Sequence, residues 1–570
     1  MSGRAQVEGR LLLVWQKTDF QFFLVDAGND VDTFNTTLPA YFARATEDPT
    51  IELAYNIKEF SDPDSRIAWY PRARALGGST QHNAMINIIS ATQTDFDNIS
   101  TNFADPSWTR SNMQEYFKKI EKNLYLLPTL LTLADHGFTG WLKTTLLPYL
   151  SLLNNLDIVD PQLLTIFTSL TLSPNPPILD LNALAEDSSV GINTPSFTVD
   201  ENHVRSSVYN RLTAVNESTS GLNITLNTLA TKILLCQGSD GLPTAYGLEF
   251  VRDAALPVAG NFEGKEDLDG RVQSVMARHE VIVSAGVFQS PQLVGLSLSH
   301  FKHWLIILSG IGNSTELSEF GIETVVDLPG VGSNLQDHDE IVVIWDLVDD
   351  FKLLQGCTFL SDPAQDPCLE DWLETDHMNI YGFSPVLDVI ITKSNEALAE
   401  SDIFTYLAPA YFEGIFRGKL SEPNHICPTN VSGRDVLDIE KMHFEAEDGP
   451  SDMQALADGI NRIRSLVENS AIKDFIVQEA VPGSDANLTQ YILDRVFGHH
   501  ACCTNPIGLS TDPNAVLDNE FRVHGVDQLR VVDLSSWPNV PGYFVTTPTY
   551  MISEKAADVI MSAAQARNSK

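Results

Sequence analysis

Two adjacent histidines near the C-terminal end are the residues of this 570-residue chain best suited to acid–base chemistry. His499 and His500 are followed, after Ala501, by Cys502 and Cys503. An imidazole can take up a proton near neutral pH, because its unperturbed pKa lies close to the pH at which most enzymes work. The four side chains could also surround a metal ion, but ligands so close in sequence would be crowded, and we predict no metal site.

Two carboxylates stand where apolar segments end. Residues 20–25 are expected to form a buried strand that leads into Asp26 and Gly28, and residues 529–532 another that leads into Asp533. An acid that closes a buried strand can accept hydrogen bonds from the ribose hydroxyls of a dinucleotide. Such an acid can equally be a turn or capping residue, so the pattern needs support from elsewhere in the chain.

A glycine-containing loop, residues 74–83, leads into the apolar segment 84–89. Gly77 and Gly78 let the backbone come close to a flat or phosphorylated ligand. Ser79, His82 and Asn83 add polar groups that could contact the same ligand.

The segments that must position these residues differ along the chain. Residues 113–122 and 142–172 carry leucines and other apolar residues at helical spacing. Residues 223–235, 245–251 and 280–284 are expected to form strands, and the last of these turns on Gly286. The pattern indicates a mixed α/β chain, long enough for two or more domains.

The net charge of −39 argues against nucleic acid or an anionic membrane as a partner, because phosphates would repel the chain. No apolar run approaches the roughly 20 residues that a membrane helix needs. Cys357 and Cys368 flank a short loop and could either form a disulfide or remain free thiols. The first fifteen residues lack the pattern of a signal peptide, yet secretion is compatible with seven glycosylation sequons, at Asn35, Asn98, Asn216, Asn223, Asn313, Asn430 and Asn487.

Several of these strings together resemble the glucose-methanol-choline (GMC) oxidoreductases, FAD enzymes that oxidise alcohols, and indicate a fungal-type member. Residues 76–83 are similar to the family signature LGGSSxxN, and residues 281–286 with 309–312 to its second signature. Residues 328–338 resemble the loop that follows the second signature, and residues 500–504 fit the pattern H-x-x-C-T around the catalytic base. The resemblance covers nearly the whole chain.

The resemblance implies a discontinuous Rossmann-like FAD-binding domain, formed by residues 1–100, 203–338 and 490–570. It also implies a substrate-binding domain of antiparallel sheet and helices, formed by residues 101–202 and 339–489. The expected partners are a small-molecule alcohol and an electron acceptor, which is oxygen or another oxidant.

The resemblance also assigns the site. His500 corresponds to the catalytic base, His499 is expected to pack away from it, and Tyr543 and Phe544 are expected to line the substrate pocket. A merely structural His500 is the alternative. His82 falls where some choline-oxidising members carry a flavin-linked histidine, although an ordinary loop contact is also open. The residues expected to bind FAD are Asp26, Gly28, Gly77, Gly78, Ser79, His82, Asn83, Gly286, Asp533, Thr546 and Thr547.

The sequence departs from the family pattern in three places. No GxGxxG loop precedes Asp26, so the chain as written is expected to bind FAD weakly or not at all. Residues 296–308 interrupt a segment that is continuous in the family. They are either the translation of a retained intron or a genuine structural insertion. Phe544 stands where the family has a second catalytic His or Asn, and its ring offers no hydrogen bond. The alternatives to an alcohol-oxidising enzyme are a non-redox lyase or cyclase on the same fold and a remnant that binds its cofactor poorly.

Overall fold

The computed structural model describes residues 21–568 except 54, 63–65, 90–92, 147–159, 172–176, 239–240, 253–271, 296–308, 376, 378, 396 and 416–438. The expectations for the segment before residue 21 and for the inserted residues 296–308 therefore lie outside the described residues.

Two pairs of parallel strands form the half of the molecule that carries the first acid-closed strand. β1 (Phe22–Val25) pairs with β9 (Leu222–Thr225), and β13 (Val281–Val283) pairs with β20 (Leu529–Val531). Because paired strands run in the same direction, the segments that follow them emerge at the same edge. Asp26 follows β1 at such an edge, as a dinucleotide-binding unit requires.

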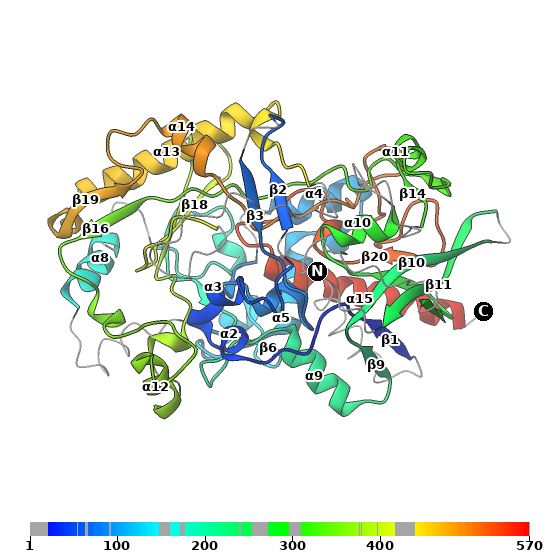
Figure 1. Ribbon diagram of the computed structural model, residues 1–570, viewed down its shortest axis with the longest axis horizontal. Coiled ribbons are helices and arrows are strands. Elements are labelled where there is room, and N and C mark those ends of the chain that lie inside the picture. The colour runs from blue at the N-terminus through cyan, green and yellow to red at the C-terminus, as the bar shows by residue number, and fades with distance from the viewer. Residues whose placement is uncertain are drawn as a thin grey trace.

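The long C-terminal helix α15 (Thr546–Asn568) packs into this half. Its residues 551–557 are all buried, so these turns have no face exposed to solvent. The helix shares one hydrophobic core with the parallel strands, through residues such as Met551 and Ile552. Figure 1 shows it running beneath strands β10 and β11, at the end of the molecule opposite helices α13 and α14.

Helix α5 (Arg110–Ile120) confirms the helix expected around residue 113 and packs along α15. It buries Met113, Phe117 and Ile120, whose spacing places them on one face. These residues belong to the same core as the parallel strands. The division into two domains stays a prediction, and α5 packs against the half that carries the parallel strands.

The segment expected to be helical from residue 142 begins instead as strand β6 (Leu142–Leu146). Its residues LKTTL include two threonines, whose branched side chains favour a pleated strand. β6 pairs with β5 (Glu121–Asn123) and β8 (Ser196–Phe197), and β8 pairs with β4 (Ile86–Asn87). Only α8 (Pro161–Thr171) among the described residues bears out the expected helix.

Antiparallel strands make up most of the remaining sheets. The strands of these sheets are β10 (Thr228–Gln237), β11 (Pro243–Arg252) and β12 (Val272–Met276); β7 (Gly191–Asn193), β17 (Val389–Thr392) and β18 (Ile403–Tyr406); β16 (Ile344–Leu347) and β19 (Ile476–Val481); and β2 (Tyr55–Lys58) and β3 (Ile67–Tyr70). A short parallel pair joins β14 (Ile311–Gly312) and β15 (Val326–Asp327).

The other described helices surround these sheets. They are α2 (Phe34–Thr37), α3 (Phe42–Ala45), α4 (Thr94–Phe103), α6 (Thr132–Asp135), α9 (Val208–Ser218), α10 (Gln289–Val294), α11 (Ser314–Glu319), α12 (Pro367–Glu374), α13 (Gly449–Glu468) and α14 (Leu488–Arg495). No helix among the described residues is both long enough and apolar enough to cross a membrane.

Candidate active site

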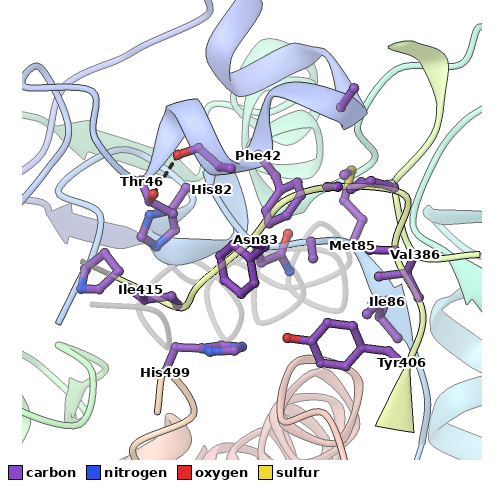
Figure 2. A pocket seen from close by; sticks show the side chains of 18 of the residues that line it. Phe42, Thr46, His82, Asn83, Met85, Ile86, Val386, Tyr406, Ile415 and His499 are labelled. Atoms are coloured by element: carbon purple, nitrogen blue, oxygen red, sulfur yellow. Dashed lines mark hydrogen bonds between the residues drawn. The ribbon is translucent and has the colours of Figure 1, made fainter. Parts of the chain in front are cut away.

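A cavity of about 990 Å³ lies where the glycine loop, the histidine segment and the start of α15 meet. Its volume is at the upper end of the range for small-molecule sites. Figure 2 shows His82, Asn83, Tyr406 and His499 among the side chains around it. The aromatic side chains that line it are Phe42, Phe359, Phe383, Tyr406, Tyr411, Phe412 and Phe544.

His500 lines this cavity and is only 7% exposed. Its backbone N–H donates to Oδ1 of Asp337 at 2.7 Å, and the next backbone N–H, that of Ala501, donates to the Tyr70 hydroxyl at 2.7 Å. The Tyr70 hydroxyl in turn donates to Oδ2 of Asp337 at 2.6 Å. A Cβ atom at Gly498 would lie 2.3 Å from the same oxygen, so only glycine allows the chain to pass this close. The backbone at the histidine is therefore fixed by a buried carboxylate.

The His500 ring is neutral at pH 7. Burial, together with the nearby His499, His338 and Arg72, lowers its pKa well below the ordinary value of histidine. Its Nδ1 lies 3.0 Å from Nδ1 of His338. A neutral imidazole at a cavity wall has a nitrogen lone pair that can accept a proton.

His499 does not point away from the site, as the sequence analysis expected, but lines the same cavity. Its Nδ1 lies 3.3 Å from Oε1 of Glu340, and the Tyr406 hydroxyl donates to Oε2 of Glu340 at 2.9 Å. Figure 2 shows the side chains of His499 and Tyr406 directed toward one another, because the same carboxyl group lies between them. Burial raises the pKa of Glu340 to about 8, so this carboxyl is mostly protonated at pH 7.

The glycine loop takes the conformation that its sequence requires. Gly77 and Gly78 have φ values of +99° and +57°, in the region that favours glycine. His82 and Asn83 line the cavity, as does Ser79. The loop is braced by Arg205, whose Nη1 donates to the backbone oxygen of Thr80 at 3.0 Å and to that of Asn83 at 2.8 Å.

Asp26 is buried at the end of β1 and accepts from the backbone N–H of Gly28 at 2.6 Å. Asn29 forms a parallel bridge with Ala75 of the glycine loop. A Cβ atom at Gly28 would lie 2.4 Å from the backbone nitrogen of Ala75, so this position has no room for a side chain. The acid-closed strand and the glycine loop are thus brought together.

Asp533 is fully buried, and both of its carboxylate oxygens are occupied by protein donors. Oδ2 accepts from the Gly286 N–H at 2.8 Å and from the Ser290 hydroxyl at 2.5 Å, and Oδ1 accepts from the N–H and the hydroxyl of Ser535. A carboxylate offers about four acceptor positions, and these donors use them. The carboxylate of Asp533 thus fixes the turn at Gly286, and a contact of this residue with the cofactor stays a prediction.

Phe544 lines the cavity as expected, with its ring 5.2 Å from that of His500. Tyr543 does not line it, because its hydroxyl bonds to Ser401 at 2.6 Å and its ring packs on Phe404.

At the start of α15, Thr546 lines the cavity, whereas Thr547 is buried away from it. The Thr547 hydroxyl donates to Oδ1 of Asn87 at 2.8 Å. Of the two threonines, only Thr546 has a side chain in reach of a ligand in the cavity.

The cysteines form two disulfides, Cys357–Cys368 and Cys502–Cys503. The sequence left open whether Cys357 and Cys368 are bonded or free, and the structure shows that they are bonded. The second removes both thiolates beside His500 as metal ligands. Glu340, His499 and His500 still place atoms of the kinds that bind metals within 4.8 Å of one another. We interpret this group as a hydrogen-bonded cluster, because His500 is engaged by His338 and Glu340 by Tyr406.

Three residues of the site, Asp337, His338 and Glu340, were not predicted from the sequence. The sequence feature that could have identified them is the run of four ionisable residues from 337 to 340, at the end of the loop formed by residues 328–338. Ionisable side chains rarely gather in a buried segment without a function, and this density could have identified them.

Comparisons with known proteins agree with this geometry. Two models of the GMC oxidoreductase family match residues 184–340 and 429–553. The oxygen-dependent choline dehydrogenase of Vibrio vulnificus is 25% identical over 560 residues, which cover 95% of this chain and 90% of that protein.

Solved structures show the same fold. Formate oxidase from Aspergillus oryzae has a TM-score of 0.77 at 20% identity, with 99% of this chain and 97% of that chain covered. An FAD-dependent oxidoreductase from Chaetomium thermophilum has a TM-score of 0.75 at 18% identity, with 99% and 98% covered.

Proposed function

Because the chain belongs to the GMC oxidoreductase family, we propose that it oxidises a primary or secondary alcohol, with FAD as hydride acceptor and His500 as base. The observation that carries the proposal is the neutral, buried imidazole of His500 at the wall of a large apolar cavity. The glycine loop forms another wall of the same cavity.

The described residues fit FAD in three respects. The carboxylate of Asp26 lies at the end of a parallel strand, where a ribose would be held. Ser79, His82 and Asn83 present polar groups to the cavity. The N-terminus of α15 begins at the cavity wall with Thr546, and its N–H groups favour a ring system that gains negative charge on reduction. When bound, FAD supplies the acceptor for the hydride.

The chain's own residues supply the proton chemistry and the shape of the site. His500 takes the hydroxyl proton of the alcohol, which makes hydride departure from the same carbon easier. Asp337 and Tyr70 hold the backbone that carries this base. Phe544 and the other aromatic side chains exclude water and hold the apolar part of the substrate.

We propose an apolar alcohol, aromatic or long-chain, as the substrate class. The support is the aromatic lining and the absence of a hydrogen-bonding side chain at Phe544.

The test begins with the absorbance spectrum of the purified protein, where bound flavin is directly visible. Flavin reduction is then followed without oxygen, with a panel of benzylic, long-chain and short polar alcohols. Reduction by the first two groups and not by the third is the expected result. A protein that holds flavin and reduces it with no alcohol would contradict the proposal and favour a non-redox reaction on this fold. Reoxidation by air or by a dye then identifies the electron acceptor.

A further inference from the structure

His338 and His500 form a ring pair whose geometry is fixed by one carboxylate. Their Nδ1 atoms are 3.0 Å apart, and the two rings meet edge to face with centroids 5.2 Å apart. Oδ1 of Asp337 accepts from the backbone N–H of His338 at 2.8 Å and from that of His500 at 2.7 Å. One buried oxygen therefore holds the backbones of both histidines beside one another.

A contact of 3.0 Å between two ring nitrogens needs one N–H donor and one bare nitrogen. Burial lowers the pKa of both histidines, so each ring is neutral at pH 7 and carries a single proton. Two arrangements are then possible, in which either His338 or His500 donates from Nδ1. They differ in whether Nε2 of His500 is bare or protonated.

A second bond of His338 distinguishes the two arrangements. Its ring also hydrogen-bonds to the backbone of Gly542, and this bond raises the pKa of His338. A bond that favours the protonated ring is one in which the ring donates, so the acceptor is the Gly542 carbonyl. The single ring N–H of His338 therefore donates to the Gly542 carbonyl, and its Nδ1 carries no proton and accepts from His500.

We infer that His338 is a positioning residue that holds the proton of His500 on Nδ1 and thereby leaves Nε2 bare to act as the base. The inference rests on the proposed function for the role of His500. Phe544 supplies no polar group beside the base, and His338 supplies one from a different segment, acting through His500 and not on the substrate. When Nε2 takes up the substrate proton, the Nδ1–H bond to His338 is kept, so no proton has to cross between the rings.

The test compares two substitutions of similar size at His338. In His338→Asn, a side-chain oxygen can stand near the place of Nδ1 and accept from His500. His338→Leu fills similar space without an acceptor. His377→Leu is the matched control, since His377 bonds to the backbone oxygen of Asn202 and does not line the cavity.

The first readout does not depend on turnover. Nitrogen NMR of protein labelled with ¹⁵N-histidine reports which ring nitrogen carries the proton, and His500→Gln identifies the His500 signals by their loss. We expect His500 to carry its proton on Nδ1 in the parent protein and in His338→Asn, and to lose this preference in His338→Leu. A proton on Nε2 of His500 in the parent protein overturns the inference.

The second readout is the rate of flavin reduction by alcohol across pH. A base held in the wrong tautomer costs up to about 10⁴-fold in serine proteases, so we expect His338→Leu to lose at least about tenfold. His338→Asn should recover most of this rate at an unchanged melting temperature. Equal rates in the parent protein and His338→Leu overturn the inference, and so does a loss in both variants that follows the loss of thermal stability. If the NMR result is as expected but no form oxidises alcohols, the proposed function alone fails.

Discussion

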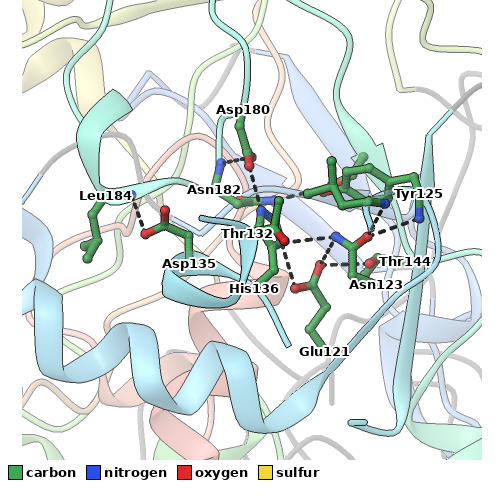
Figure 3. A network of polar contacts seen from close by, with 12 residues as sticks. Glu121, Asn123, Tyr125, Thr132, Asp135, His136, Thr144, Asp180, Asn182 and Leu184 are labelled. Carbon is green, nitrogen blue, oxygen red and sulfur yellow. Dashed lines mark hydrogen bonds and ion pairs between the residues drawn. The ribbon is translucent and has the colours of Figure 1, made fainter. Parts of the chain in front are cut away.

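Replacement of His136 tests whether a buried ion network stabilises the fold in a pH-dependent way. His136 is 2% exposed and lies between two carboxylates, with Nδ1 2.8 Å from Glu121 and Nε2 2.6 Å from Asp180 (Figure 3). The network ties strand β5 to the loop around residue 180. The backbone N–H of Gly137 donates to the same Glu121 carboxylate at 3.0 Å.

The size of the effect follows from the shifted pKa of His136. Burial opposes the charged ring, but the hydrogen bonds to Asp180 and Glu121 outweigh it and raise the pKa of His136 from 6.5 to about 10. A raised pKa stabilises the folded protein fully below the unfolded pKa, and the gain is lost as pH rises through the folded pKa. The linkage relation gives a contribution of about 4 kcal/mol at pH 7 and below about 1 kcal/mol at pH 9.5.

The assay is the melting temperature of the parent protein and of His136→Gln between pH 6.5 and 9.5. Glutamine is neutral, so the variant should melt several degrees lower at pH 7, because the buried carboxylate of Glu121 and the half-buried one of Asp180 lose their cation. The difference should shrink steadily as pH rises. His377→Gln, which changes a histidine outside this network, controls for general effects of the substitution. A difference that stays constant or grows with pH would refute the reasoning.

Three further predictions concern separate parts of the structure. Replacing Cys357 and Cys368 together by serine should lower stability by about 2–3 kcal/mol, the entropy of a closed loop of this size, and the shift in melting temperature should vanish when both proteins are measured under reducing conditions. Gly28→Ala should weaken the binding of FAD at least tenfold, because the added Cβ would displace the backbone of Ala75. Equilibrium dialysis with FAD measures the affinity. An unchanged affinity would show that the glycine loop does not contribute to binding. Phe544→Asn should raise the rate of flavin reduction with short polar alcohols relative to benzylic ones, by offering a hydrogen bond near the developing alkoxide, and an unaltered preference would mean that this position does not face the substrate.

The sequence predicted the parts of the fold that depend on local pattern. The strand before Asp26, the strand leading to Gly286 and the helix around residue 113 are where their apolar residues and glycines indicated. The glycine loop was predictable for the same reason, because Gly77 and Gly78 adopt φ values that other residues rarely reach.

The direction of single side chains could not be predicted in this way. Tyr543 was expected to line the cavity and His499 to point away from it, and the structure shows the reverse. The direction of such a side chain depends on partners that are distant in sequence. Ser401 draws Tyr543 away from the cavity, and Glu340 engages His499 at its wall. The carboxylate oxygens of Asp533 are likewise occupied by Gly286, Ser290 and Ser535, which the sequence did not indicate. Tertiary contacts decided each of these cases, and no spacing in the sequence reports them.

The role of His500 is tested most directly by anaerobic single-turnover flavin reduction in flavin-loaded protein, which isolates hydride transfer from reoxidation. We predict that His500→Ala slows reduction by an apolar alcohol by roughly 10²–10⁴-fold, the usual contribution of a general base, while His377→Ala reduces flavin at the parent rate. An unchanged rate in His500→Ala would contradict the account, because the neutral imidazole at the cavity wall would then take no part in the reaction.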